Sequence, residues 1–270
     1  MACSRDSDRI GICFDGWVLN KTYASLMVEM LKHILYARGQ IPCLFDQAKR
    51  LFVSSSELVP KTLLQRKQKS IHSSLSLFDS LFQNLTTSIT DLEVNQVVFS
   101  LGPTLVSPKE VYVVDLPPSL KCGECKGKSL NQLVCVRYFF RNLMSSGILN
   151  RPDSPSLTNM TVMIEIPRNS NLKNFMKMRN YKIPNRGKKL TICVHHKNCD
   201  HLPFVPFCDS DSCDSDTSNH FMSLARDMER VTINSNPNEQ LDQYCWIQIL
   251  PTIKGFKDLV TTQNSMDNWI

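Results

Sequence analysis

The chain has 270 residues, of which 42% are hydrophobic and 21% are charged, so it can bury one sizeable core. Its longest apolar runs are only as long as strands, which excludes a membrane-spanning helix. The formal net charge of +6 conceals a locally acidic segment, because residues 197–242 hold nine acidic and three basic residues, a net −6 that leaves +12 for the rest of the chain.

The first third of the chain predicts two long helices after a flexible lead-in. Residues 1–20 are polar and mixed, and we expect them to form that lead-in. From Thr22 apolar residues recur every three and four positions, which predicts a helix that Gly39 and Pro42 end. Residues 53–61 then predict a linker. The second helix carries an apolar stripe about five turns long, at Ile71, Leu75, Phe78, Phe82, Leu85 and Ile89.

The middle of the chain predicts a β-hairpin and a third helix. Residues 94–101 and 110–116 are rich in β-branched side chains and are separated by glycine and proline, as in paired strands. Ser129 and Gln132 then have the spacing of a capping box, in which two side chains satisfy the first amides of a helix. We therefore expect a helix over 130–146.

The second half of the chain completes the predicted fold. Residues 161–166, 190–195 and 244–250 are further strand candidates. Three helices interleaved with at least five strands, without a regular βαβ rhythm, predict an α+β domain with an antiparallel or mixed sheet. The Asp/Ser-rich stretch at about 197–240 predicts a flexible acidic insertion, and residues 261–270 are expected to form a C-terminal tail.

No catalytic signature is present in the sequence. A nucleophile elbow, a phosphate-binding loop and a dinucleotide fingerprint are all absent from it. We therefore expect no enzymatic activity and no cofactor. Residues 1–15 lack the apolar core of a signal peptide, so we expect an intracellular protein whose eleven cysteines are reduced.

Two sequence features leave another kind of interaction module open. Cys122 and Cys125 have the spacing of half a zinc site. Further candidate ligands follow at Cys193, His195, His196, Cys199 and His201. Neighbouring residues of a strand point to opposite faces, so Cys193 and His195 would share a face from which His196 points away. The alternative is therefore that these residues are loop cysteines and incidental histidines. Residues 167–190 hold eight Lys or Arg and no acid, which is compatible with a nucleic-acid surface, a nuclear import signal, a docking loop for an acidic partner or a solvated hairpin.

The helix predicted over 130–146 has two apolar faces, of which only one can line the centre of the core. The uncharged face is the better core face, and it comprises Gln132, Cys135, Val136, Phe139 and Leu143. This leaves Phe140 near the surface between Arg137 and Arg141, a composition typical of an interface hot spot. The alternative is that both phenylalanines are internal because the domain packs on two sides.

Several short motifs occur along the chain, principally MLKHI at 30–34, SPKE at 107–110, NY at 180–181 and KGF at 254–256. Combinations such as SPKE with a tyrosine two positions later are not generic. In these motifs and in their order over roughly residues 26–257, the chain resembles the comet family of proteins that bind the checkpoint protein Mad-two (Mad2).

The resemblance implies a single HORMA-like domain over about 21–260, with three central helices packed on a mostly antiparallel sheet and C-terminal safety-belt strands. It also implies an adaptor that binds closed Mad2 by mimicking a Mad2 protomer. Such an adaptor delivers Mad2 to an AAA+ remodelling ATPase of the Pch-two type, which promotes disassembly of the mitotic checkpoint complex and checkpoint silencing. The implied location is the nucleus and cytoplasm, and the spindle or kinetochore in mitosis, with no nucleic acid or membrane as partner.

The resemblance also assigns residues to these contacts. The aromatic residue that touches Mad2 falls on Phe140. The full set expected to bind Mad2 is Phe140, Arg137, Arg141, Leu133, Met144, Tyr36, Ala37 and Arg38. Ala37 stands where the family is expected to have a polar residue. The contact with the remodeller is expected at Lys177, Met178 and Arg179.

Overall fold

A computed structural model describes the parts of the chain on which the following account rests, namely residues 8–55, 64–117, 129–147, 149, 155–168, 176–178, 181–196 and 244–257. The acidic insertion and the C-terminal tail expected from the sequence lie outside these residues. The elements in chain order are β1 (Asp8–Phe14), α1 (Asn20–Ala37), α2 (Phe45–Ser55), α3 (Leu64–Asp91), β2 (Gln96–Gly102), β3 (Glu110–Asp115), α4 (Gln132–Ser145), β4 (Asn159–Pro167), β5 (Met176–Met178), β6 (Lys188–His196) and β7 (Tyr244–Lys254).

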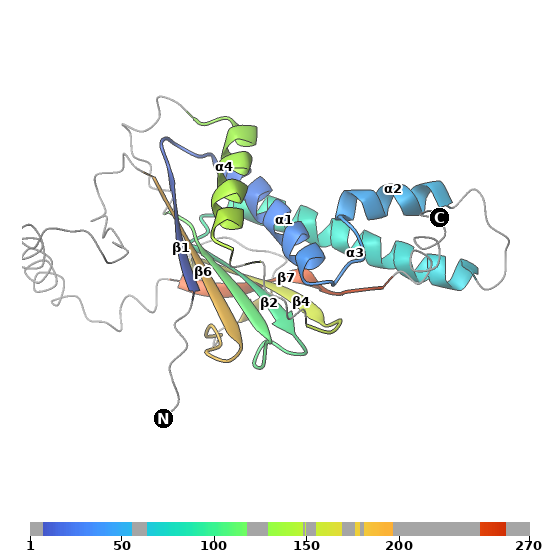
Figure 1. Cartoon of the computed structure of the whole chain (residues 1–270). Coiled ribbons are helices and arrows are strands. Elements are labelled where there is room, and N and C mark those ends of the chain that lie inside the picture. Colours follow the sequence, from blue (N-terminus) through green and yellow to red (C-terminus); the bar gives the residue numbers. More distant parts are fainter. Residues whose placement is uncertain are drawn as a thin grey trace, which may run out of the picture.

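A seven-stranded mixed sheet is the platform of the domain, with strand order β1-β6-β3-β2-β4-β7-β5 (Figure 1). The pairs β1/β6 and β3/β6 are parallel, and the other four pairs are antiparallel. The predicted hairpin is confirmed by the pairing of β2 with β3. These findings confirm the α+β class and the mostly antiparallel sheet.

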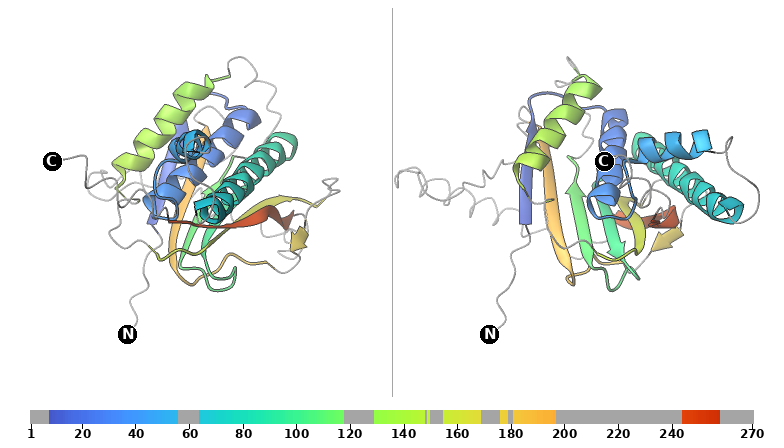
Figure 2. Two further views of the ribbon diagram at one scale, coloured as in Figure 1. Left: turned by 90° about the vertical axis from the view of Figure 1, so that its right-hand side faces the viewer. Right: turned by 45° about the vertical axis from the view of Figure 1, so that its right-hand side comes forward.

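The helices lie on one side of this sheet (Figure 2). α1 packs between α3 and α4, and the buried side chains of these helices share one hydrophobic core with the strands. The stripe predicted for the second helix lies on α3, with Phe78 and Leu85 wholly buried. α2 lies against the first part of α3 (Figure 1). Among the described helices, none is long and apolar enough to cross a membrane.

The flexible lead-in predicted over residues 1–20 is wrong for residues 8–14. Residues 8–14 form β1, a strand at one edge of the sheet that pairs with β6. Its sequence alternates between apolar and other residues, and Ile12 and Phe14 are buried under the helices. This alternation was present in the sequence but is short, so the surrounding polar residues concealed it.

The helix α2 was also missed in the sequence. Residues 45–55 form it, and they include the beginning of the linker predicted over 53–61. The rest of that linker, residues 56–61, lies outside the described residues. Phe45 anchors α2, because its ring packs on Phe78 and Phe82 of α3 with centroid distances of 5.9 and 4.9 Å.

The end of α1 is closed by the glycine that the sequence indicated. Gly39 has a φ of 58°, a conformation that residues with a Cβ rarely adopt. The Gly39 amide donates to the Tyr36 carbonyl at 2.9 Å, and the Gln40 amide donates to the Leu35 carbonyl at 2.8 Å. These two bonds form a Schellman motif, which satisfies the last carbonyls of the helix.

Arg38, at the end of α1, is buried in an ionic network with β3. Its Nε lies 3.0 Å from Glu110 Oε2 and donates a hydrogen bond of 2.8 Å to the Tyr112 hydroxyl. That hydroxyl in turn donates to Glu110 Oε2 at 2.6 Å. The two charged side chains are only 1% and 5% exposed, so each depends on the other for its charge to be tolerated.

Gln40 extends this anchor to β4 and to the end of β7. Its Oε1 accepts a hydrogen bond of 2.9 Å from the Thr158 amide. Its carbonyl oxygen accepts one of 2.8 Å from the Phe256 amide. A Cβ on Gly255 would lie 2.6 Å from that same carbonyl oxygen, so only glycine allows the chain to approach so closely.

We predict that Arg38→Met lowers the free energy of unfolding by about 3–5 kcal/mol, because it leaves the buried Glu110 carboxylate without its cation. Urea denaturation measures this change. Arg141→Met is the matched control, since Arg141 is exposed on α4 and its loss is expected to change stability by less than about 0.5 kcal/mol. Equal unfolding midpoints for the two variants would show that the network does not stabilise the fold.

Candidate protein-binding surface

The start of α4 sets which of its residues face the core. Asn131 caps the helix, because its side-chain oxygen accepts a hydrogen bond of 2.9 Å from the Leu133 amide. The capping box predicted from Ser129 and Gln132 is therefore wrong. Ser129 lies before the helix in an isolated β-bridge, and Gln132 Nε2 instead donates to Ser25 Oγ of α1 at 2.9 Å. Asn131, which lies closer to the helix than Ser129, accepts the hydrogen bond of the free Leu133 amide instead.

The predicted core face of α4 is confirmed. Cys135, Phe139 and Leu143 are buried, and Val136 is half-buried against the same core. Gln132 alone departs from that face, since it is exposed in the first turn.

The opposite side of α4 is exposed and combines apolar side chains with arginines. Leu133 is 66% exposed and Met144 is 39% exposed. Arg137 and Arg141 are exposed as well, and α4 contains no acidic residue. The helix therefore offers apolar area and positive charge together, which suits a partner that has both apolar and acidic groups.

Phe140 occupies the seam between α4 and α1 and is half-buried. Its ring packs edge-on against Phe139 and against His33 of α1, with centroid distances of 5.6 and 5.9 Å. Each of the two sequence alternatives for Phe140, at the surface or in the interior, is therefore partly right. The ring is held in place by its neighbours and still presents part of its surface to solvent.

The end of α1 supplies the second predicted part of this surface. Tyr36 is 44% exposed, and Ala37 is half-buried. Both lie one helical turn beyond His33, which contacts Phe140. Arg38 must be removed from the predicted set, because its side chain is buried in the network with Glu110 and cannot reach a partner.

Sequence reasoning missed the two exposed apolar residues Val134 and Tyr138. Val134 is 58% exposed and Tyr138 is 39% exposed, and they lie one turn apart on α4. The Tyr138 ring packs on Phe14 of β1 with a centroid distance of 5.6 Å. Their spacing of four residues was a visible signal, but its meaning depended on β1, which had been expected to be a flexible segment.

The residues expected to contact a remodeller lie at the other edge of the sheet. Lys177 and Met178 belong to β5, the edge strand opposite β1. Lys177 is exposed, whereas Met178 is half-buried against a small cluster on the sheet face away from the helices. Arg179 lies outside the described residues.

The candidate zinc ligands that fall within the described residues are not brought together. Cys193 Sγ accepts a hydrogen bond of 3.0 Å from Arg9 Nε and donates to Asp115 Oδ2 at 3.3 Å. His196 points to the other face, where its Nε2 meets the Tyr23 hydroxyl. Among the described residues, no group of three or more possible ligands could hold a metal ion. His195 is exposed on the same strand, and the other candidates, Cys122, Cys125, Cys199 and His201, lie outside that part of the chain.

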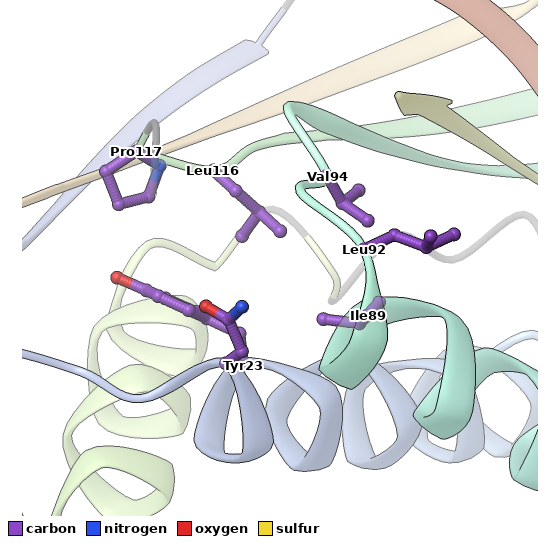
Figure 3. Close-up of a pocket in the computed structure, with 7 residues that line it drawn as sticks. Tyr23, Ile89, Leu92, Val94, Leu116 and Pro117 are labelled. Atoms are coloured by element: carbon purple, nitrogen blue, oxygen red, sulfur yellow. The ribbon is translucent and has the colours of Figure 1, made fainter. Parts of the chain in front are cut away.

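A small pocket lies between the start of α1 and the end of α3 (Figure 3). Its volume of about 10 Å³ is roughly what one water molecule needs, so it does not accommodate a small-molecule substrate. Its lining is mostly apolar and comprises Asn20, Tyr23, Ile89, Leu92, Val94, Leu116 and Pro117.

We predict that the protein loses stability as the pH falls below about 6.5, and that His33 contributes to this loss. Burial, and secondarily the positive charge of Arg38, lower the pKa of His33 below its ordinary value of 6.5. The unfolded chain therefore takes up the proton first as the pH falls, so stability is complete above 6.5 and declines below it. Burial lowers the pKa of His196 in the same direction.

His33→Gln should therefore show a smaller loss of unfolding free energy between about pH 7.5 and about pH 5 than the wild type. Urea denaturation at the two pH values measures the difference. Identical losses in the two proteins would contradict the role of His33.

Comparison with known proteins identifies the family to which these features belong. A family model described as p31comet, with Mad1 and Cdc20-bound-Mad2 binding, matches residues 1–211. The MAD2L1-binding protein of Homo sapiens is 29% identical over 199 residues, which cover 71% of this chain and 72% of that protein. The mouse protein of the same name is 29% identical over 198 residues, covering 71% and 70%. The chain therefore belongs to the p31comet family of HORMA-like, Mad2-binding proteins.

Proposed function

We propose that this chain is an adaptor that binds closed, Cdc20-bound Mad2 and presents it to an AAA+ remodelling ATPase of the Pch-two type. It binds by mimicking a Mad2 protomer, and it acts through binding rather than catalysis. The outcome is disassembly of the mitotic checkpoint complex and silencing of the checkpoint. Because these partners act in mitosis, we place the chain in the nucleus and cytoplasm, and at the spindle or kinetochore during mitosis.

The observation that carries this proposal is the exposed face of α4 beside the end of α1. Phe140 is held by His33 and Phe139, so little side-chain entropy is lost when a partner covers it. Arg137 and Arg141 flank it with donors that can pair with acidic groups. A central aromatic anchor with arginines beside it is the composition at which binding energy concentrates.

Delivery to a remodeller is supported by the positions of the two predicted contact regions. α4 covers the β1 end of the sheet, whereas Lys177 lies on β5 at the opposite edge. A partner on α4 therefore leaves β5 accessible, and an adaptor that bridges two proteins needs this separation. Lys177 is exposed and offers a charge for an acidic surface.

We predict that Phe140→Ala raises the dissociation constant for closed Mad2 by about thirtyfold, which corresponds to the loss of about 2 kcal/mol of a central aromatic anchor. Isothermal titration with Mad2 locked in its closed form measures the change, and open Mad2 is expected to bind far more weakly than closed Mad2 to the wild-type chain.

Tyr244→Ala is the matched control for this variant, because Tyr244 is an exposed aromatic residue on β7, away from α4. It should bind closed Mad2 as the wild type does. Circular dichroism must show that Phe140→Ala is folded. A folded Phe140→Ala protein with wild-type affinity would refute the assignment of the binding surface to the α1–α4 seam.

We also predict that Lys177→Glu weakens recruitment of the remodelling ATPase while Mad2 binding stays within about twofold of the wild type, since the change reverses a charge at the far edge of the sheet. A pull-down of the ATPase with the preformed adaptor–Mad2 complex measures it, and Lys49→Glu on α2 is a control of equal charge change. Equal recruitment by both variants would exclude Lys177 from the contact.

A further inference from the structure

The exposed face of α4 has two apolar flanks that lie on either side of its arginines. Each residue of an α-helix turns by about 100°, so Phe140 and Tyr138 point about 200° apart around the axis. Phe140 faces α1 and Tyr138 faces β1, in agreement with their ring contacts to His33 and Phe14. α4 lies between these two elements, over β1 on one side and beside α1 on the other (Figures 1 and 2).

The flank that contains Tyr138 and Val134, here the β1 flank, resembles the flank that contains Phe140, here the α1 flank. The Tyr138 ring packs on the buried ring of Phe14 and stays partly exposed, just as the Phe140 ring packs on His33. Val134 lies one turn before it and is more than half exposed. A tyrosine that is held by packing supplies rigid contact area at a low entropic cost, and tyrosine is frequent among binding hot spots for this reason.

The arginines lie between the two flanks. The directions of Arg137 and Arg141 around the helix fall between those of Phe140 and Tyr138 on the exposed side. Across its width, the face therefore consists of an apolar zone, a positively charged zone and a second apolar zone. A partner surface that matches it carries acidic groups along a centre line with apolar side chains on both sides.

The size of a stable interface requires more than one flank. Stable complexes bury about 800 Å² on each partner. α4 has 14 residues, which makes it about 21 Å long, and one flank of such a helix supplies only a small part of that area. Only the exposed arginines of the same helix separate the flank beside Tyr138 from the flank beside Phe140, so the Tyr138 flank adjoins the surface already proposed.

We infer that Mad2 straddles α4, so that Val134 and Tyr138 on the β1 flank contact the same partner as Phe140 on the α1 flank. This inference rests on the proposed function and extends its surface to residues beyond the α1–α4 seam. It also assigns a binding role to β1, because Phe14 supports the tyrosine.

Titration with locked closed Mad2 tests the inference with three variants. Tyr138→Ala and Val134→Asp should each raise the dissociation constant at least about fivefold. Tyr138→Phe keeps the ring and should stay within about twofold of the wild type. Val134→Asp is needed because Val134 is 58% exposed, so its substitution is expected to leave the fold intact and to test binding alone. Leu77→Ala on α3, a similarly exposed apolar residue, is the control.

The outcomes separate this inference from the proposed function. Loss of affinity in Tyr138→Ala, Val134→Asp and Phe140→Ala supports both. If only Phe140→Ala loses affinity, the straddling arrangement is wrong and the proposed function stands. If no variant of either flank loses affinity, Mad2 does not bind this face and both are overturned. Should Tyr138→Ala fail to fold, the result with Val134→Asp alone decides the question.

Discussion

The buried contact between Arg38 and Glu110 is the constraint on which the rest of the domain depends. It ties the end of α1 to β3 through charges that are almost fully excluded from solvent. Gln40 continues the attachment to β4 and to the end of β7. Because an unpaired charge at this place would be very costly, α1 has only one favourable position on the sheet. The arrangement of the candidate surface depends on that position of α1.

The position of α1 in turn determines what α4 can expose. His33 lies one turn before the anchored end of α1 and meets the ring of Phe140. On the other side of α4, β1 brings Phe14 under Tyr138. The core residues of α4 hold the helix between these two supports. The partly exposed aromatic residues of α4 are therefore each supported by a neighbouring ring, which lowers the entropic cost of covering them.

The arrangement also separates the two surfaces that the proposed adaptor function would use. The α4 face lies at the β1 end of the sheet, and β5 lies at the opposite edge. Under that proposal, one partner could be held on α4 while β5, at the other edge of the sheet, stays uncovered. Related proteins of the same family are named for binding Mad2. Binding of this kind uses surfaces rather than catalytic groups.

The sequence by itself determined the local elements and the main core face. Residue periodicity predicted α1 and α3, β-branched composition predicted most strands, and Gly39 marked the end of α1, because these are properties of neighbouring residues. The helix α4 was also predicted, although from a capping box that Asn131 replaces. The motifs also indicated the family. Only the tertiary structure decided that Arg38 is buried and that Tyr138 belongs to the exposed face. Those outcomes depend on Glu110 and Phe14, partners distant in sequence that are brought close only when the sheet and the helices pack together.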